Sequence, residues 1–81
     1  MSERTPVSLK YPIEIDGATV SVLHLRRAKV RDRLTAQKMA NSDAEREIAL
    51  IAMLADVAPS DIENLDMADY SALQEALTGF F

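Results

Sequence analysis

The chain lacks cysteine altogether and is poor in histidine. Its 81 residues include no Cys and a single histidine, His24. Disulfides and thiolate metal sites are therefore excluded, and a zinc site at His24 would need carboxylates as its remaining ligands. We expect neither a metal ion nor a cofactor.

Glycine and long apolar runs are also scarce. Gly17 and Gly79 are the only glycines, which excludes the glycine-rich loops that cradle phosphates. The longest apolar run, residues 48–54, is far too short to cross a bilayer. The first five residues lack the apolar stretch of a secretion signal. We therefore expect a cytoplasmic protein without a membrane-spanning segment.

At 81 residues the chain is predicted to form one domain, with residues 1–6 as a flexible N-terminus and residues 7–81 as the folded unit. A domain of this size buries a modest core and often depends on disulfides, metals or partner subunits. Because the sequence excludes disulfides, we expect it to form a homo-oligomer.

Positive and negative charges are separated along the chain, although the net charge is only −4. Residues 1–40 hold eight of the nine Lys and Arg residues and four acids, giving +4; residues 41–81 hold one Arg and nine acids, giving −8. A basic patch is predicted at Arg26, Arg27, Lys29, Arg31 and Arg33. Charge runs are usually solvated faces, and the overall acidity disfavours nucleic acid. We expect the patch to face acids of the C-terminal half, within one chain or between copies.

Residues 7–25 predict a β-hairpin, the strand part of an α+β fold. Apolar and polar residues alternate from Val7 to Ile15, which is the period of a strand. Asp16-Gly17 suits a two-residue type I′ turn, in which both residues need positive φ. The strand pairs predicted from this turn are Ile15 with Ala18, Ile13 with Val20, Tyr11 with Val22, and Leu9 with His24.

Some residues complicate this hairpin. Pro12 cannot donate a ladder hydrogen bond, so the first strand has a free side or a break there. Leu23 and Leu25 fall on the face opposite the other apolar residues. Either both faces are partly covered, or a bulge shifts the phase after Val22. His24 is predicted to be a partly buried strand residue rather than a ligand or a catalytic base.

The rest of the chain predicts three to four short helices, at residues 28–40, 42–57, 60–64 and 66–78. Ser42 and Ser60 each stand three residues before a glutamate, which is the spacing of a capping box. Asp66 suits a helix N-terminus, and Gly79 suits a helix end. Val30 and Leu34 share one face of the first of these helices. The helix at 42–57 is apolar on two sides, which predicts a central helix or one that also meets another subunit.

The acids Asp61, Glu63, Asp66 and Asp69 cluster at the last two helices. Their spacing matches no EF-hand loop, and roles at helix ends explain them without a cation. No nucleophile or orienting acid accompanies His24. We therefore expect a protein that is not an enzyme.

Four segments in this order resemble the small tail assembly chaperones of Mu-like contractile-tailed phages and prophages. They are Leu9-x-Tyr11-Pro12-Ile13-x-x-Asp16-Gly17-x-x-Val20, Leu23-His24-Leu25-Arg26-Arg27, the apolar helix Ile48–Leu54, and the segment Pro59–Tyr70. The resemblance covers residues 7–81. Ala28 departs from it, because a proline is expected after the two arginines, and this leaves the start of the first helix open.

The resemblance implies a non-enzymatic chaperone that binds the long, helical tape measure protein before tail tube subunits polymerise around it. Such a protein acts in the host cytoplasm and is absent from the mature virion. The resemblance also implies a longer form, made by a ribosomal frameshift, that reaches the tail tube protein. Phe80 and Phe81 would lie at the start of that extension.

The expected surface for the partner or for further copies is apolar. It consists of Tyr11, Ile13, Val20, Val22, Leu50, Ile51, Met53, Leu54, Phe80 and Phe81. Two alternatives remain open. One is a small DNA-binding regulatory protein that uses the basic patch, and the other is a structural tail subunit that stays in the particle.

Overall fold

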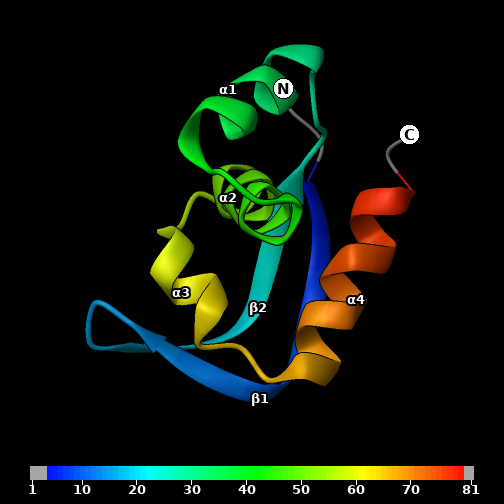
Figure 1. Cartoon of the computed structure of the whole chain (residues 1–81). Coiled ribbons are helices and arrows are strands. Elements are labelled where there is room, and N and C mark those ends of the chain that lie inside the picture. The colour runs from blue at the N-terminus through cyan, green and yellow to red at the C-terminus, as the bar shows by residue number, and fades with distance from the viewer. Residues whose placement is uncertain (1–3, 80–81) are drawn as a thin grey trace.

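The computed structural model of the chain describes residues 4–79, in which a β-hairpin precedes four helices (Figure 1). The hairpin strands are β1 (Arg4–Ile15) and β2 (Ala18–Arg26), which form a two-stranded antiparallel sheet. The helices are α1 (Val30–Met39), α2 (Asp43–Ala55), α3 (Pro59–Glu63) and α4 (Met67–Thr78). The predicted α+β class, a hairpin followed by three to four short helices, is confirmed.

The hairpin turn forms as predicted. Asp16 and Gly17 have φ values of 52° and 82°, the positive values that a type I′ turn needs at both positions. The pairs Ile15 with Ala18 and Ile13 with Val20 also match the prediction. The local chemistry of the turn thus sets the register of the near half of the hairpin.

The predicted register is wrong beyond Ile13. Val22 pairs with Ser8 instead of Tyr11, because β1 is irregular between Ser8 and Ile13. Four residues of β1 lie between Ser8 and Ile13, whereas on β2 only Ser21 lies between their partners. The break therefore lies in the first strand, at the segment that contains the proline, and not in β2.

This irregularity changes which side chains of the hairpin face the helices. The three extra residues in β1 are an odd number, so the inner face changes phase across the break. Val7, Leu9, Leu23 and Leu25 are all buried. His24 is exposed and lies opposite a proline near the strand start, so the prediction of partial burial is wrong. Residues 4–6, predicted to be flexible, belong to β1 and pair with the end of β2.

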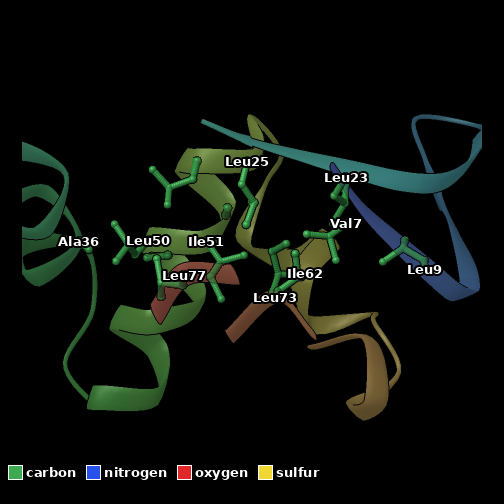
Figure 2. Packing of buried hydrophobic residues seen from close by; sticks show 13 residues of the cluster. Val7, Leu9, Leu23, Leu25, Ala36, Leu50, Ile51, Ile62, Leu73 and Leu77 are labelled. Atoms are coloured by element: carbon green, nitrogen blue, oxygen red, sulfur yellow. The ribbon is translucent and has the colours of Figure 1, made fainter. Parts of the chain in front are cut away.

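Both strands and all four helices contribute to one apolar core (Figure 2). Its members are Val7, Leu9, Leu23, Leu25, Ala36, Ala49, Leu50, Ile51, Ala52, Leu54, Ile62, Leu73 and Leu77. Figure 2 shows that the side chains of α2 and α4 point toward those of the hairpin. Each fully buried Leu or Ile contributes roughly 1.5–3 kcal/mol relative to an exposed one. The core therefore rests on α2, α4 and the hairpin, and α1 adds only Ala36.

Two of the three predicted helix starts are confirmed. The hydroxyl of Ser42 accepts a hydrogen bond from the Glu45 backbone N–H at 3.2 Å, at the start of α2. The carboxylate of Asp66 accepts one from the Ala68 N–H at 2.9 Å, at the start of α4. Both bonds satisfy amides that the first turn of a helix leaves without a partner.

The capping box predicted at Ser60 is wrong. Pro59 occupies the first position of α3, where its fixed φ and missing N–H suit a helix start, so the cap is Ala58. The side chain of Asp61 accepts a hydrogen bond from the Ala58 N–H at 3.1 Å. Asp61 therefore takes the role that the sequence pattern gave to Glu63.

Candidate interaction surface

A partly buried ion pair joins the end of β2 to the start of α1. The two Nη atoms of Arg26 donate to the two carboxylate oxygens of Asp32, each at 2.8 Å. One of those oxygens also accepts from the Lys29 backbone N–H at 2.8 Å. Bidentate, charge-assisted bonds of this kind fix geometry as well as add energy. They hold α1 in one orientation on the hairpin.

The electrostatics of this pair follow from its geometry. The hydrogen bond from Arg26, helped by that from Lys29, lowers the pKa of Asp32 to about 2, although burial of the carboxyl acts the other way. The bond to Asp32 raises the pKa of Arg26, and the charge of Asp56 adds to this at longer range. We expected the basic patch to face acids of the C-terminal half. Arg26 instead forms its ion pair with Asp32, which lies in the basic segment itself.

The ion pair turns the apolar face of α1 outward. The buried residues of α1 are Asp32 and Ala36. Val30 and Leu34, which share a face, are 81% and 56% exposed. Because residues four apart lie on the same side of a helix, the pairs 32/36 and 30/34 define opposite sides. This helix therefore presents an apolar stripe to solvent.

The predicted basic patch is divided by the fold. Arg27, Lys29 and Arg31 are exposed, whereas Arg26 is half-buried in its pair. Arg33 lines a cleft of about 300 Å³ between α1, α2 and α4. The same cleft is lined by Asp43, Arg46 and Glu47, so Arg33 does share its surroundings with acids of the C-terminal half. Arg31 and Arg33 are both exposed, but at two residues apart they do not share one row of α1.

The second candidate surface lies on the hairpin. Tyr11, at the irregularity of β1, is 58% exposed. Ile13, Val20 and Val22 are half-buried, and Ile13 and Val20 also pack against the core. In Figure 1 the turn of the hairpin extends past α3, away from the body of the molecule. We call these four residues the hairpin surface.

Three residues predicted for the interface are inside the protein instead. Leu50, Ile51 and Leu54 of α2 belong to the core, and the last two have no exposed surface. Ile51 and Leu54 are covered by the chain's own helices and strands, so a partner of the folded chain cannot reach them, whereas Leu50 lines the cleft between α1, α2 and α4. Met53 is half-buried. Phe80 and Phe81 lie outside the described residues, so their predicted role stays a prediction.

An acid of α4 fixes the backbone of the hairpin surface. The carboxylate of Asp69 is buried and accepts hydrogen bonds from the backbone N–H groups of Lys10, at 2.8 Å, and Tyr11, at 3.0 Å. These two amides lie in the irregular part of β1. Asp69 therefore supplies acceptors to amides where the strand pairing is interrupted, and it fastens α4 to β1.

Sequence reasoning missed this role and assigned Asp69 to the start of α4. A signal was present, because Asp69, Leu73 and Leu77 follow one another at intervals of four and so share a helix face. An acid in an otherwise apolar stripe indicates a buried carboxylate that needs donors. Pro12 marked the strand break that provides them.

A second polar contact joins α2 to α4. Glu47 accepts hydrogen bonds from the Tyr70 hydroxyl at 2.5 Å and from the Gln74 side-chain amide at 2.7 Å. Burial raises the pKa of Tyr70, and the hydrogen bond to Glu47 raises it further. The Tyr70 hydroxyl therefore stays protonated at ordinary pH and remains a donor. This contact supports the packing behind the cleft.

Within the described part of the chain, no three His, Cys, Asp or Glu side chains gather closely enough to hold a metal ion. The clustered acids have other roles, because Asp61 and Asp66 cap helices and Asp69 holds β1. Across residues 4–79, no helix has both the length and the apolar character needed to span a membrane.

Comparison with known proteins gives one match. A family model described as "Phage tail assembly chaperone proteins, E, or 41 or 14" matches residues 6–81, which is nearly the whole chain. This match confirms the resemblance seen in the sequence. No curated protein and no solved structure matches the chain.

Proposed function

Because this chain belongs to the family of phage tail assembly chaperone proteins, we propose that it binds the tape measure protein of its phage and assists assembly of the tail tube around it. It does so without catalysing a reaction. It acts in the host cytoplasm and is absent from the mature virion. The tape measure protein is the partner that the family resemblance implies.

The hairpin surface is the site that best suits this role. The observation that supports this choice is that Asp69 holds the backbone of Tyr11, while Tyr11 itself stays mostly exposed. An exposed aromatic residue on a fixed backbone offers a large contact area and loses little freedom on binding. Ile13, Val20 and Val22 add half-buried apolar area on the same hairpin.

The chemistry of this surface fits the apolar side of a helix. Amphipathic helices dock through apolar residues spaced along one face, and exposed apolar residues that gather in one place mark such contacts. A long helical partner offers many equivalent positions. Many copies could then bind along it, so a modest affinity for each copy would suffice.

Co-expression with the tape measure protein tests this function. We expect the wild-type chain to co-purify with the tape measure protein and to raise its soluble fraction. Tyr11→Ala should lower the amount that co-purifies, because it removes the exposed ring but keeps the backbone amide that binds Asp69. Met39→Ala is the matched control, because Met39 is similarly exposed, at 52%, but lies at the end of α1.

The proposal fails if the wild-type chain neither co-purifies with the tape measure protein nor changes its solubility. The proposed site fails separately if Tyr11→Ala and Met39→Ala bind equally well while both keep the wild-type circular dichroism spectrum. The two results are distinguishable because the first involves no substitution.

A longer form is part of this proposal. A frameshifted extension after Phe81 would carry the contact with the tail tube protein, while the short form coats the tape measure protein. Sequencing the 3′ end of the gene tests it. The expected result is a slippery run of nucleotides and an overlapping reading frame, and their absence would remove the longer form from the account.

The two alternative functions have their own tests. The DNA-binding alternative gains from the exposed Lys29 and Arg31 but loses Arg26, which is engaged with Asp32. Binding to duplex DNA that falls steeply with salt would favour it. Mass spectrometry that detects the chain in purified virions would favour a structural subunit instead.

A further inference from the structure

α1 carries a surface that combines apolar and positively charged side chains. Val30 and Leu34 are exposed on its outer side. Arg31 and Lys38 are also exposed, and they lie three residues before and four residues after Leu34, so all three share a row. The one acid of α1, Asp32, is buried in its pair with Arg26. We call Val30, Arg31, Leu34 and Lys38 the α1 patch.

The connection between α3 and α4 carries a surface of the opposite charge. Met67 is 72% exposed, the largest exposure after Val30 among the large apolar residues of the described chain. Glu63 and Asp66 precede it by four residues and one residue, and both are exposed. Asp66 caps α4 through its side chain, which still leaves its negative charge at the surface. We call Glu63, Asp66 and Met67 the corner patch.

Most of the α1 patch lies far from the start of α4 within one molecule, whereas Glu63 lines a small pocket together with Met39, the residue after Lys38. Figure 1 shows α1 at one end of the structure and the start of α4 at the other. Each patch combines exposed apolar side chains with charges, positive on the α1 patch and negative on the corner patch. A surface that complements the α1 patch is therefore present on every other copy of the chain. A symmetric pairing of two α1 helices would instead set Arg31 and Lys38 against the same cations, which is unfavourable.

We propose that the chain self-associates head to tail, with the α1 patch of one copy on the corner patch of the next. A contact between two different surfaces leaves one free patch at each end, so it repeats and produces a row or a ring of copies. This inference concerns the isolated chain and is independent of the proposed partner.

The contact should be weak in free solution. Exposed ion pairs contribute little each, and each patch offers only one or two apolar side chains. Copies that already lie side by side on a long partner would reach a high effective concentration, at which a weak contact becomes populated. A head-to-tail contact of this kind would give an ordered row without strong aggregation of the free chain.

Sedimentation velocity of the isolated chain, at concentrations up to about 1 mM, tests the proposal through paired variants. Arg31→Glu/Lys38→Gln reverses the α1 patch, and Glu63→Lys/Asp66→Asn reverses the corner patch. Asparagine at position 66 keeps a good helix cap. We expect each variant alone to self-associate about tenfold more weakly than wild type, and the mixture of the two to recover association, because each supplies a patch complementary to the other.

Net charge provides the control. Arg31→Glu/Lys38→Gln and the control Arg4→Glu/Ser8→Glu change the charge equally, but the control alters exposed positions on β1. The control should associate like wild type. Glu63→Lys/Asp66→Asn brings the net charge from −4 closer to zero, so a general repulsion would strengthen its association where the proposed contact predicts a loss.

The proposal is overturned if the wild-type chain stays monomeric throughout the concentration range. It is also overturned if the two patch variants associate like wild type, or if their mixture is no stronger than either alone while both are folded by circular dichroism. Should a charge variant unfold, Leu34→Ser provides a second variant, and unchanged association of that variant likewise contradicts the α1 patch.

Discussion

α1 and α2 are neighbouring helices that turn their apolar residues in opposite directions. α2 places Ile51 and Leu54 in the centre of the core, whereas α1 exposes Val30 and Leu34. The difference lies in the start of α1, where Asp32 binds both the Arg26 side chain and a backbone amide. An apolar stripe of two residues is a weak orienting force beside such charge-assisted bonds.

The comparison shows that apolar spacing identifies a helix better than it identifies the buried face. In α2 the apolar residues are numerous enough to decide the orientation. In α1 they are few, and a buried polar contact decides it instead. In α1, the ion pair of Asp32 fixes the helix with its apolar side chains in solvent, where they are free to contact other molecules.

The largest expected effect on stability comes from a core residue of α2. Ile51→Ala removes a side chain without exposed surface, and we expect it to lower the free energy of unfolding by about 2–5 kcal/mol, because the core cannot fully close the cavity. Urea denaturation measures this loss. A loss below about 1 kcal/mol would show that α2 is not the centre of the core.

The second effect concerns the buried acid of α4, whose role parallels that of Asp32 in α1. Asp69→Ala leaves the Lys10 and Tyr11 amides without their acceptor, and we expect a loss of about 2–3 kcal/mol. Hydrogen exchange at these two amides should accelerate by more than the change in global stability explains. Asp69→Asn keeps one oxygen acceptor and serves as the control, with a smaller loss. Unchanged exchange at both amides would contradict the contact.

The third effect is a pH dependence of the bond that orients α1. The pKa of Asp32 is about 2 in the fold against 3.8 ordinarily. A lowered folded-state pKa stabilises the fold above the unfolded-state pKa, and this contribution disappears as the pH falls toward 2. Comparison with Asp32→Asn isolates it. The wild type should be more stable by about 1–2 kcal/mol near pH 6, and the difference should shrink between about pH 4 and pH 2. A difference that stays constant with pH would exclude this origin.

The smallest expected effect on stability comes from an exposed apolar residue of α1. Leu34→Ala removes an apolar side chain that is largely in solvent, so we expect the free energy of unfolding to change by no more than about 0.5 kcal/mol. The same urea experiment that measures Ile51→Ala measures it. A loss comparable to that of Ile51→Ala would mean that the outer face of α1 is covered.

Much of the fold could be predicted because the signals are local. The turn at Asp16-Gly17 depends on two adjacent residues, and the start of α2 depends on Ser42 and the next turn of helix. These need no knowledge of distant contacts. The start of α3 was misjudged by two residues because Pro59 competes with Ser60, and the proline determines where that helix begins.

The rest could not be predicted because it depends on contacts between residues far apart in sequence. The strand break near Pro12 was visible, but its length depends on Asp69 of α4, which binds the freed amides. The residues predicted for the interface on the hairpin are exposed or half-buried in the structure, whereas Leu50, Ile51 and Leu54 are buried. Apolar spacing alone could not separate these two sets, because each has the spacing that buried residues show in its own element, alternation on a strand and intervals of three to four on a helix.

Thiol labelling tests the orientation of α1 most directly, because the chain has no cysteine of its own. Leu34→Cys and Ala36→Cys each introduce one thiol, at positions on the exposed and the buried side of α1. The thiol of Leu34→Cys should react with a soluble disulfide reagent nearly as fast as in the unfolded chain, and that of Ala36→Cys at least about a hundredfold more slowly. Rapid reaction at position 36 with protection at position 34 would show that α1 buries its apolar face, and would contradict the account.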